Sequence, residues 1–161
     1  MDKKITIDLS AKSIDSALKE VRKYKAWVLA KEKELRQRLA MLGASVASIK
    51  FSTAIYNGTN DVSVRVEDDG SMATIYAEGE SVAFIEFGAG DKYGYGYPQA
   101  EKFGVGPGTY PDGKGNWDNP KGWYIPGGEH TYGNPPAMAM YGAVQAITEQ
   151  VTMIAKEVFS K

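Results

Sequence analysis

A stripe of hydrophobic residues with helical spacing runs through the N-terminal part of the chain. Its positions are three and four residues apart, and only two of them are charged: Ile14, Leu18, Val21, Lys25, Val28, Glu32, Leu35, Leu39 and Leu42. This period predicts an amphipathic helix over 13–42, about 45 Å long. Ser13 is suited to cap the helix, and Gly43 is suited to end it. Residues 44–56 keep a weaker helical spacing, which predicts a continuation or a second short helix.

Alternating residues predict a β-hairpin after this helical part. Asp69-Gly70 is a typical two-residue turn between two such stretches. With this turn, one face of the hairpin is apolar and the other is polar. The expected facing pairs are Val66–Ala73, Val64–Ile75, Val62–Ala77, Arg65–Thr74 and Ser63–Tyr76. Residues 5–9 alternate in the same way, which fits a short strand or a terminal arm.

The C-terminal part of the chain predicts a second amphipathic helix. Pro135-Pro136 is suited to open it, because proline is tolerated in the first helical turn. The segment 81–88 fits either a third strand or a short helix closed by Gly88. Two helices packed on an antiparallel sheet built on the hairpin predict a single α+β domain over 1–161. The apolar stripe of the last helix consists of Met140 or Tyr141, Val144, Ile147, Val151, Ile154 and Val158.

The segment 88–134 has a different composition from the rest of the chain, with 13 Gly, 5 Pro, 6 Tyr and 2 Trp. So long a stretch without periodicity is normally functional or disordered, and disordered segments are poor in aromatic residues. Glycine combined with tyrosine and tryptophan is typical of recognition surfaces. We therefore expect partner contacts at Tyr93, Tyr95, Tyr97, Trp117 and Trp123. The alternative is that Trp117, Trp123, Tyr124 and Ile125 fold back as a further hairpin against the sheet.

Composition and charge narrow the range of functions. The chain has no cysteine and a single histidine, which disfavours disulfides, thiolate zinc sites and all-histidine metal sites. The net charge is −1, yet residues 1–50 carry 12 Lys and Arg against 6 Asp and Glu, and residues 51–161 carry 7 against 14. Opposite charges at the two ends favour pairing with copies of the chain or with charged partners. The simpler interpretation is a solvated basic helix. No apolar run reaches the length of a membrane span.

The chain offers little that predicts catalysis or a bound cofactor. Glu129-His130 is a candidate for proton transfer, but a hydrogen-bonded histidine that fixes the start of the last helix is the favoured interpretation. The glycine-rich triplets lack the context of a phosphate-binding loop, and the acidic residues near the hairpin lack the spacing of a calcium loop. Acids interspersed among the lysines of the first helix argue against a dedicated nucleic-acid binder. We therefore expect no cofactor, no metal and no sequence-specific nucleic-acid partner.

Two motifs flank the glycine-rich segment and carry a family resemblance. The first is Glu-Phe-Gly-x-Gly over 86–90, and the second is His-x-x-Gly-x-Pro over 130–135, followed by Met140 at the entry to the last helix. With the long insertion between them, they resemble the small head–tail joining or tail completion proteins of long-tailed phages, the family typified by gene product ten of phage Hong Kong ninety-seven. Ala89 stands where many members have threonine, and the histidine and glycine on either side of Tyr132 are often closer together.

The resemblance implies an α+β fold and a structural position in the neck of the virion, without catalysis. It implies that Phe84 and Phe87 anchor the first motif in the core, and that Glu86 forms a salt bridge or caps a helix. Unusual backbone angles are expected at Gly88 and Gly90, and the start of the last helix is expected to be set by the second motif. The residues of that second motif are His130, Gly133, Pro135 and Met140.

The expected function is therefore that of a structural protein that joins or completes the head–tail interface, located in the virion and in the host cytoplasm during assembly. Expected partners are other neck and tail proteins, namely a connector or stopper and a tail terminator or tail tube, with a ring of identical copies among the arrangements. A second hypothesis is a non-catalytic module that binds a small ligand or carbohydrate on the aromatic loop 88–134. A third is an enzyme that uses Glu86 or Glu129-His130.

Overall fold

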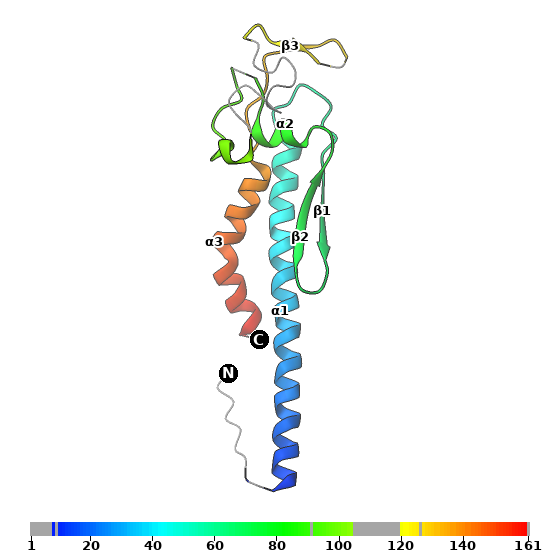
Figure 1. Cartoon of the computed structure of the whole chain (residues 1–161), viewed down its shortest axis with the longest axis vertical. Helices are drawn as coiled ribbons and strands as arrows, with labels where there is room; N and C mark the ends of the chain where they lie inside the picture. Colours follow the sequence, from blue (N-terminus) through cyan, green and yellow to red (C-terminus); the bar gives the residue numbers. More distant parts are fainter. Residues whose placement is uncertain (1–7, 9, 91, 105–119, 126, 161) are drawn as a thin grey trace.

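The structure is a computed structural model that describes residues 8, 10–90, 92–104, 120–125 and 127–160. Its elements are α1 (Ala11–Ser52), β1 (Ser63–Asp68), β2 (Ala73–Glu78), α2 (Val82–Phe87), the 3₁₀ helix η1 (Ala100–Phe103), β3 (Trp123–Tyr124), β4 (His130–Thr131) and α3 (Ala139–Phe159). Figure 1 shows α3 and the β1–β2 hairpin on two sides of α1, with α2 across one end of the helix pair. The predicted α+β class is confirmed. The alternation expected over 5–9 and the contact expected at Trp117 lie outside the described residues.

The first helix begins earlier than the sequence predicts, and of the two alternatives for residues 44–56 the continuation occurs, as far as Ser52. Its N-cap is Ser10, not Ser13, because the Ser10 side chain accepts a hydrogen bond from the Ser13 amide at 3.2 Å. Gly43 does not end the helix, which continues to Ser52. At Gly43 the hairpin and α3 both come close to α1: an added Cβ would lie 2.6 Å from a methyl group of Ile75 and 2.7 Å from one of Ile147. The glycine serves close packing, and those contacts offset its low helix propensity.

The hairpin forms with the predicted faces but in a different register. The observed pairs include Val66 with Ile75 and Val64 with Ala77, so the pairing is shifted by two residues from the prediction. A shift of two leaves every side chain on its predicted face. The turn lies at Gly70-Ser71 instead of Asp69-Gly70, because the Asp69 carboxylate accepts hydrogen bonds from the amides of Ser71 and Met72, both at 2.7 Å.

An ion pair fastens the end of this hairpin to α1. Arg36 donates to the Asp68 carboxylate at 2.9 Å and 3.4 Å, and both side chains are mostly buried. The pKa of Asp68 is lowered by a hydrogen bond from the Gly70 amide and, next, by Arg36. The hairpin is thus held to the helix by a carboxylate that must be ionised.

We expect this carboxylate to make the hairpin sensitive to acid. The pKa of Asp68 is lower in the folded chain than in the unfolded chain. The ionised carboxylate therefore stabilises the folded chain fully at a pH above the pKa of the unfolded state, and this stabilisation is lost as the pH falls through the pKa of the folded state. Urea unfolding followed by circular dichroism at pH 7 and at about pH 3 measures the loss. Asp68→Asn should be less stable than the wild type at pH 7 and lose less on acidification. An unchanged loss in the variant would contradict this role.

The core lies where α1, α2 and α3 meet. Its buried residues are mostly small, which lets the helices approach closely: Ala47, Phe51, Ile85, Ala139 and Ala143. Phe84 and Phe87, expected in this core, are only half-buried. The segment 81–88 forms the short helix and not the strand, so Val82 and Ile85, three residues apart, face the core together and the phenylalanines flank them.

The last helix begins later than the proline pair predicts. It starts at Ala139, and its N-cap residue Met138 has a left-handed backbone with φ of 50° and no side-chain cap. Its buried face includes Ala143, Ile154 and Val158, whereas Val144, expected in the stripe, is exposed. The apolar pattern predicts that larger residues such as Val144 contact α1. In the structure, small residues such as Ala143 form part of that contact instead.

Candidate functional site

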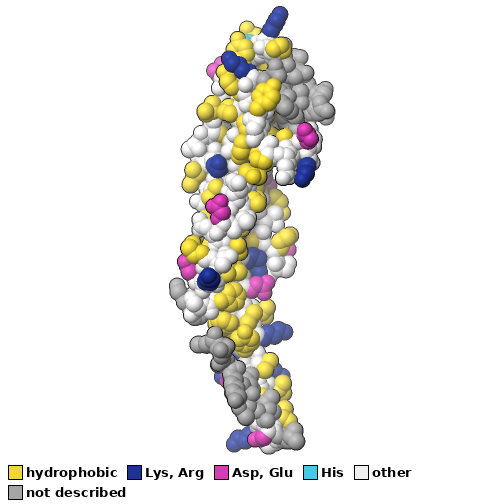
Figure 2. Space-filling view, turned by 90° about the vertical axis from the view of Figure 1, so that its left-hand side faces the viewer, with side chains coloured by type: hydrophobic (Ala, Val, Ile, Leu, Met, Phe, Trp, Pro, Cys, Tyr) yellow, Lys and Arg dark blue, Asp and Glu magenta, His cyan; other side chains and the backbone are white. Residues whose placement is uncertain are grey.

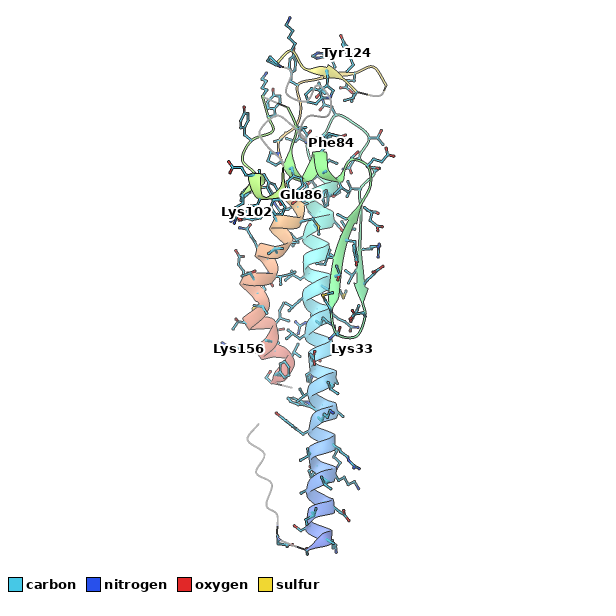
Figure 3. The ribbon with its side chains drawn as sticks, viewed as in Figure 1. Lys33, Phe84, Glu86, Lys102, Tyr124 and Lys156 are labelled. Carbon is cyan, nitrogen blue, oxygen red and sulfur yellow. The ribbon has the colours of Figure 1, made fainter. Side chains whose placement is uncertain are left out.

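The two motifs that flank the glycine-rich segment meet in the folded chain. Ala89 and Asn134 form an isolated antiparallel bridge, with both amide-to-carbonyl bonds at 2.9 Å. The Asn134 side chain also donates to the Phe84 carbonyl at 2.8 Å. Residues 86–90 and 130–136 therefore form one structure, here called the junction. It lies at the end of the helix pair, beside the start of α3 (Figure 3).

Three glycines allow the two backbones of the junction to come this close. Gly133 has φ of 99°, and an added Cβ would lie 1.9 Å from the Ala89 carbonyl oxygen. At Gly90, with φ of 87°, it would lie 2.3 Å from the Tyr132 carbonyl oxygen. At Gly88, with φ of 79°, it would lie 2.8 Å from the Pro136 nitrogen. Real Cβ atoms do not approach backbone atoms this closely, so the junction requires glycine for both space and conformation.

Glu86 supplies the cap that α3 lacks locally. The carboxylate is 3% exposed and accepts hydrogen bonds from the first three amides of α3: Ala139 at 2.7 Å, Met140 at 2.9 Å and Tyr141 at 3.1 Å. These amides have no partner within the helix, and the positive end of the helix dipole favours a carboxylate there. Of the two roles expected for Glu86, the structure shows the cap.

Tyr97 completes the shell of the Glu86 carboxylate. Its hydroxyl donates to the second carboxylate oxygen at 3.0 Å, and its ring contacts Phe87 with a centroid distance of 4.5 Å. Burial, and then the neighbouring Glu86 carboxylate, raise the pKa of the Tyr97 phenol above its ordinary value. Tyr97 was expected to contact a partner. Because it is half-buried and bonded inside the junction, it supports the fold instead.

The exposed aromatic residues lie beside the junction. Tyr93 and Tyr95 are each about half exposed, which fits the contact role expected for them. The Lys92 ammonium lies 5.1 Å from the ring centroid of Tyr93 and 5.2 Å from that of Tyr132. The chain between the motifs therefore presents amphipathic aromatic rings on its surface, and such rings are enriched at protein interfaces.

His130 does not set the start of α3 as expected. It lies in β4, nine residues before α3, and its ring contacts Tyr124 and Tyr132 with centroid distances of 4.9 Å. Its strand pairs with β3 in a two-stranded sheet separate from β1–β2. The fold-back considered for Trp123 and Tyr124 thus occurs, but as a small sheet of its own. In the second motif, Gly133 lies against Ala89 and the Met140 amide donates to Glu86, whereas the side chain of Pro135 is exposed.

A cavity of about 330 Å³ lies between this small sheet and the rest of the chain. It is lined by aromatic and polar side chains from three regions, including Tyr56, Asn57, Glu80, Phe84, Trp123 and Tyr124. Tyr124, labelled in Figure 3, projects from the end of the molecule away from the helix pair. Aromatic walls with a few polar groups are typical of small-ligand sites.

The chemistry that this arrangement supports is binding and positioning. Both oxygens of Glu86 already accept hydrogen bonds from amides and from Tyr97, so the carboxylate holds backbone and does not face a substrate. Among the residues that the structure describes, no cluster of three or more His, Cys, Asp or Glu side chains could hold a metal ion.

The roles of two residues at and beside the junction do not follow from the sequence pattern. Asn134 and Met138 stand within or beside the second motif, and neither was given a role. The Gly-Asn-Pro-Pro sequence at 133–136 does indicate an irregular backbone held by side-chain bonds. Asparagine often forms hydrogen bonds with backbone groups, and proline disfavours a regular helix.

The chain was compared with family models, curated proteins and solved structures, and none of them matches it.

Proposed function

We propose that the chain is a structural protein of the phage neck that joins or completes the head–tail interface during assembly. The observation that carries the proposal is the junction. The two motifs on which the resemblance rests, 40 residues apart, form one structure in which Glu86 and the glycines each have a necessary role. The residues of the two motifs stabilise the fold, and exposed aromatic rings lie in the chain between them. This arrangement suits a protein that acts by binding other proteins.

The partners proposed for this chain are other neck and tail proteins, and its place is the virion. Removing the gene from the phage or prophage that encodes it, followed by electron microscopy of the particles, tests the proposal. DNA-filled heads and separate tails are expected. Intact infectious particles would contradict it, as would a gene that lies outside any phage or prophage genome.

Replacing Tyr93 and Tyr95 together with alanine should weaken joining and leave the fold intact. Both rings are about half exposed in the single chain, and aromatic side chains often dominate interface energies. We expect a loss of infectious particles of at least about tenfold. The measurement is a plaque count in a deletion strain that supplies the variant from a plasmid. A matched control is Tyr76→Ala, an exposed ring on the hairpin, which should assemble normally.

The cavity supports a second candidate function, that of a non-catalytic module that binds a small molecule or carbohydrate. Trp123 and Tyr124 line its wall, so a bound sugar ring would stack on them and quench tryptophan fluorescence. Titration with a panel of mono- and disaccharides tests this candidate. Saturable quenching in the wild type that disappears in Trp123→Phe would support it, and no saturable change with any sugar would contradict it.

A further inference from the structure

The N-terminal half of α1 has an apolar face that no described part of the chain covers. α3 ends beside this region, where the rings of Trp27 and Phe159 meet with a centroid distance of 5.9 Å. Below this point Ile14, Leu18 and Val21 are 42%, 49% and 51% exposed. Figure 1 shows α1 extending beyond both α3 and the hairpin, and Figure 2 shows hydrophobic side chains continuing along it.

This face continues the side of α1 that is buried in the rest of the molecule. Lys25 lies 18 residues before Gly43, which is about five full turns, so both point in the same direction. Gly43 is the position that Ile75 and Ile147 cover. The exposed stripe (Ile14, Leu18, Val21 and Lys25) is therefore a helix face of the kind that the hairpin and α3 occupy higher on the same helix.

We propose that residues 11–28 of α1 pair antiparallel with the same residues of a second copy of this chain. The stripe has a heptad spacing, with Leu18 and Lys25 at a positions and Ile14 and Val21 at d positions. Antiparallel pairing of a with d sets Leu18 against Val21 of the second copy, twice by symmetry, and Ile14 against Lys25. Lysine at this outer layer can extend its ammonium group into water.

The length of the uncovered helix fits this register. Residue 28 of one copy then lies opposite residue 11 of the other, so the covered part of each copy begins where the helix of the other ends. The pair uses residues 11–28, at the end of which Trp27 contacts Phe159 of α3. A contact of this kind is self-complementary and closes at two copies.

Charge supports the same register. The antiparallel pairing sets Asp15 of each copy beside Arg22 of the other, giving two oppositely charged pairs at the edge of the seam. Both side chains are exposed in the single chain. The other basic residues, Lys12, Lys19 and Lys23, occupy outward heptad positions, where their charges stay in water. The inference does not depend on the proposed neck function, because it uses only residues of α1.

Sedimentation equilibrium of the full chain tests the proposal. A concentration-dependent dimer is expected, and Leu18→Glu should raise its dissociation constant by about a hundredfold because each dimer loses two apolar contacts. Met41→Glu is the matched control, since Met41 is 69% exposed on the opposite side of α1 and should leave the dimer unchanged. Circular dichroism of both variants should match the wild type.

Charge reversal tests the register itself. Asp15→Arg and Arg22→Asp should each raise the dissociation constant about tenfold, and the double variant should restore it, because the pairs are then reversed in both copies. A monomer at every concentration, a dimer that survives Leu18→Glu, or a larger assembly would overturn the proposal. A dimer in which the double variant is no better than the single variants would overturn the antiparallel register.

Discussion

Glu86→Gln is expected to lower the free energy of unfolding by about 3 kcal/mol. The carboxylate accepts four hydrogen bonds, from three amides of α3 and from the Tyr97 hydroxyl. Glutamine has nearly the same shape, but its NH₂ group would face an N–H or O–H donor, and its charge no longer stabilises the helix terminus. Urea unfolding followed by far-ultraviolet circular dichroism measures the difference.

Glu101→Gln provides the matched control for this effect. It makes the same change on the exposed helix η1 and should alter stability by less than about 0.5 kcal/mol. Hydrogen exchange adds a local measurement, since protection of the Ala139, Met140 and Tyr141 amides should fall in Glu86→Gln first. Equal stability of the two glutamine variants would mean that the Glu86 cap contributes nothing.

The second large effect is expected at Gly133. Gly133→Ala should lose more than about 3 kcal/mol or fail to form the junction, because the new methyl group meets the Ala89 carbonyl in a backbone conformation that already disfavours alanine. Thermal unfolding and the near-ultraviolet circular dichroism of the neighbouring tyrosines report the loss.

Gly128→Ala separates backbone strain from the clash. Gly128 also has a positive φ, of 89°, but an added Cβ there has nothing within 4 Å. Its substitution should cost only about 1 kcal/mol, the penalty for a left-handed alanine. An equal loss of unfolding free energy in the two alanine variants would contradict this account, because it would mean that the close approach of the two motifs does not require glycine at position 133.

Local patterns predicted the two long helices, the hairpin and the faces of the hairpin. Alternation with a period of two separates the apolar from the polar face, and this holds even though the register is shifted by two residues. The register was wrong because side-chain bonds of Asp69 decide the position of the turn, and dipeptide preference does not capture them. Gly43 was misread for a similar reason: contacts from Ile75 and Ile147 keep a glycine inside a helix that local propensity would end.

The junction could be anticipated only in part. The resemblance identified Glu86 and the glycines as structural, but the α3 amides that Glu86 binds lie more than 50 residues away in sequence, and no local pattern reveals that distance. Tyr97 looked like its exposed neighbours Tyr93 and Tyr95, because the three repeat with the same spacing beside glycines. Only the folded chain distinguishes the ring that bonds Glu86 from the two that face solvent.

The central claim, that this chain joins heads to tails, is tested most directly by complementation in vitro. Separated heads and tails from a strain that lacks the gene would be mixed with the purified full chain, and infectious particles would be counted. The account predicts that the wild-type chain restores infectivity and that the Tyr93→Ala and Tyr95→Ala double variant restores much less. Infectivity that does not rise when the folded wild-type chain is added would contradict the account.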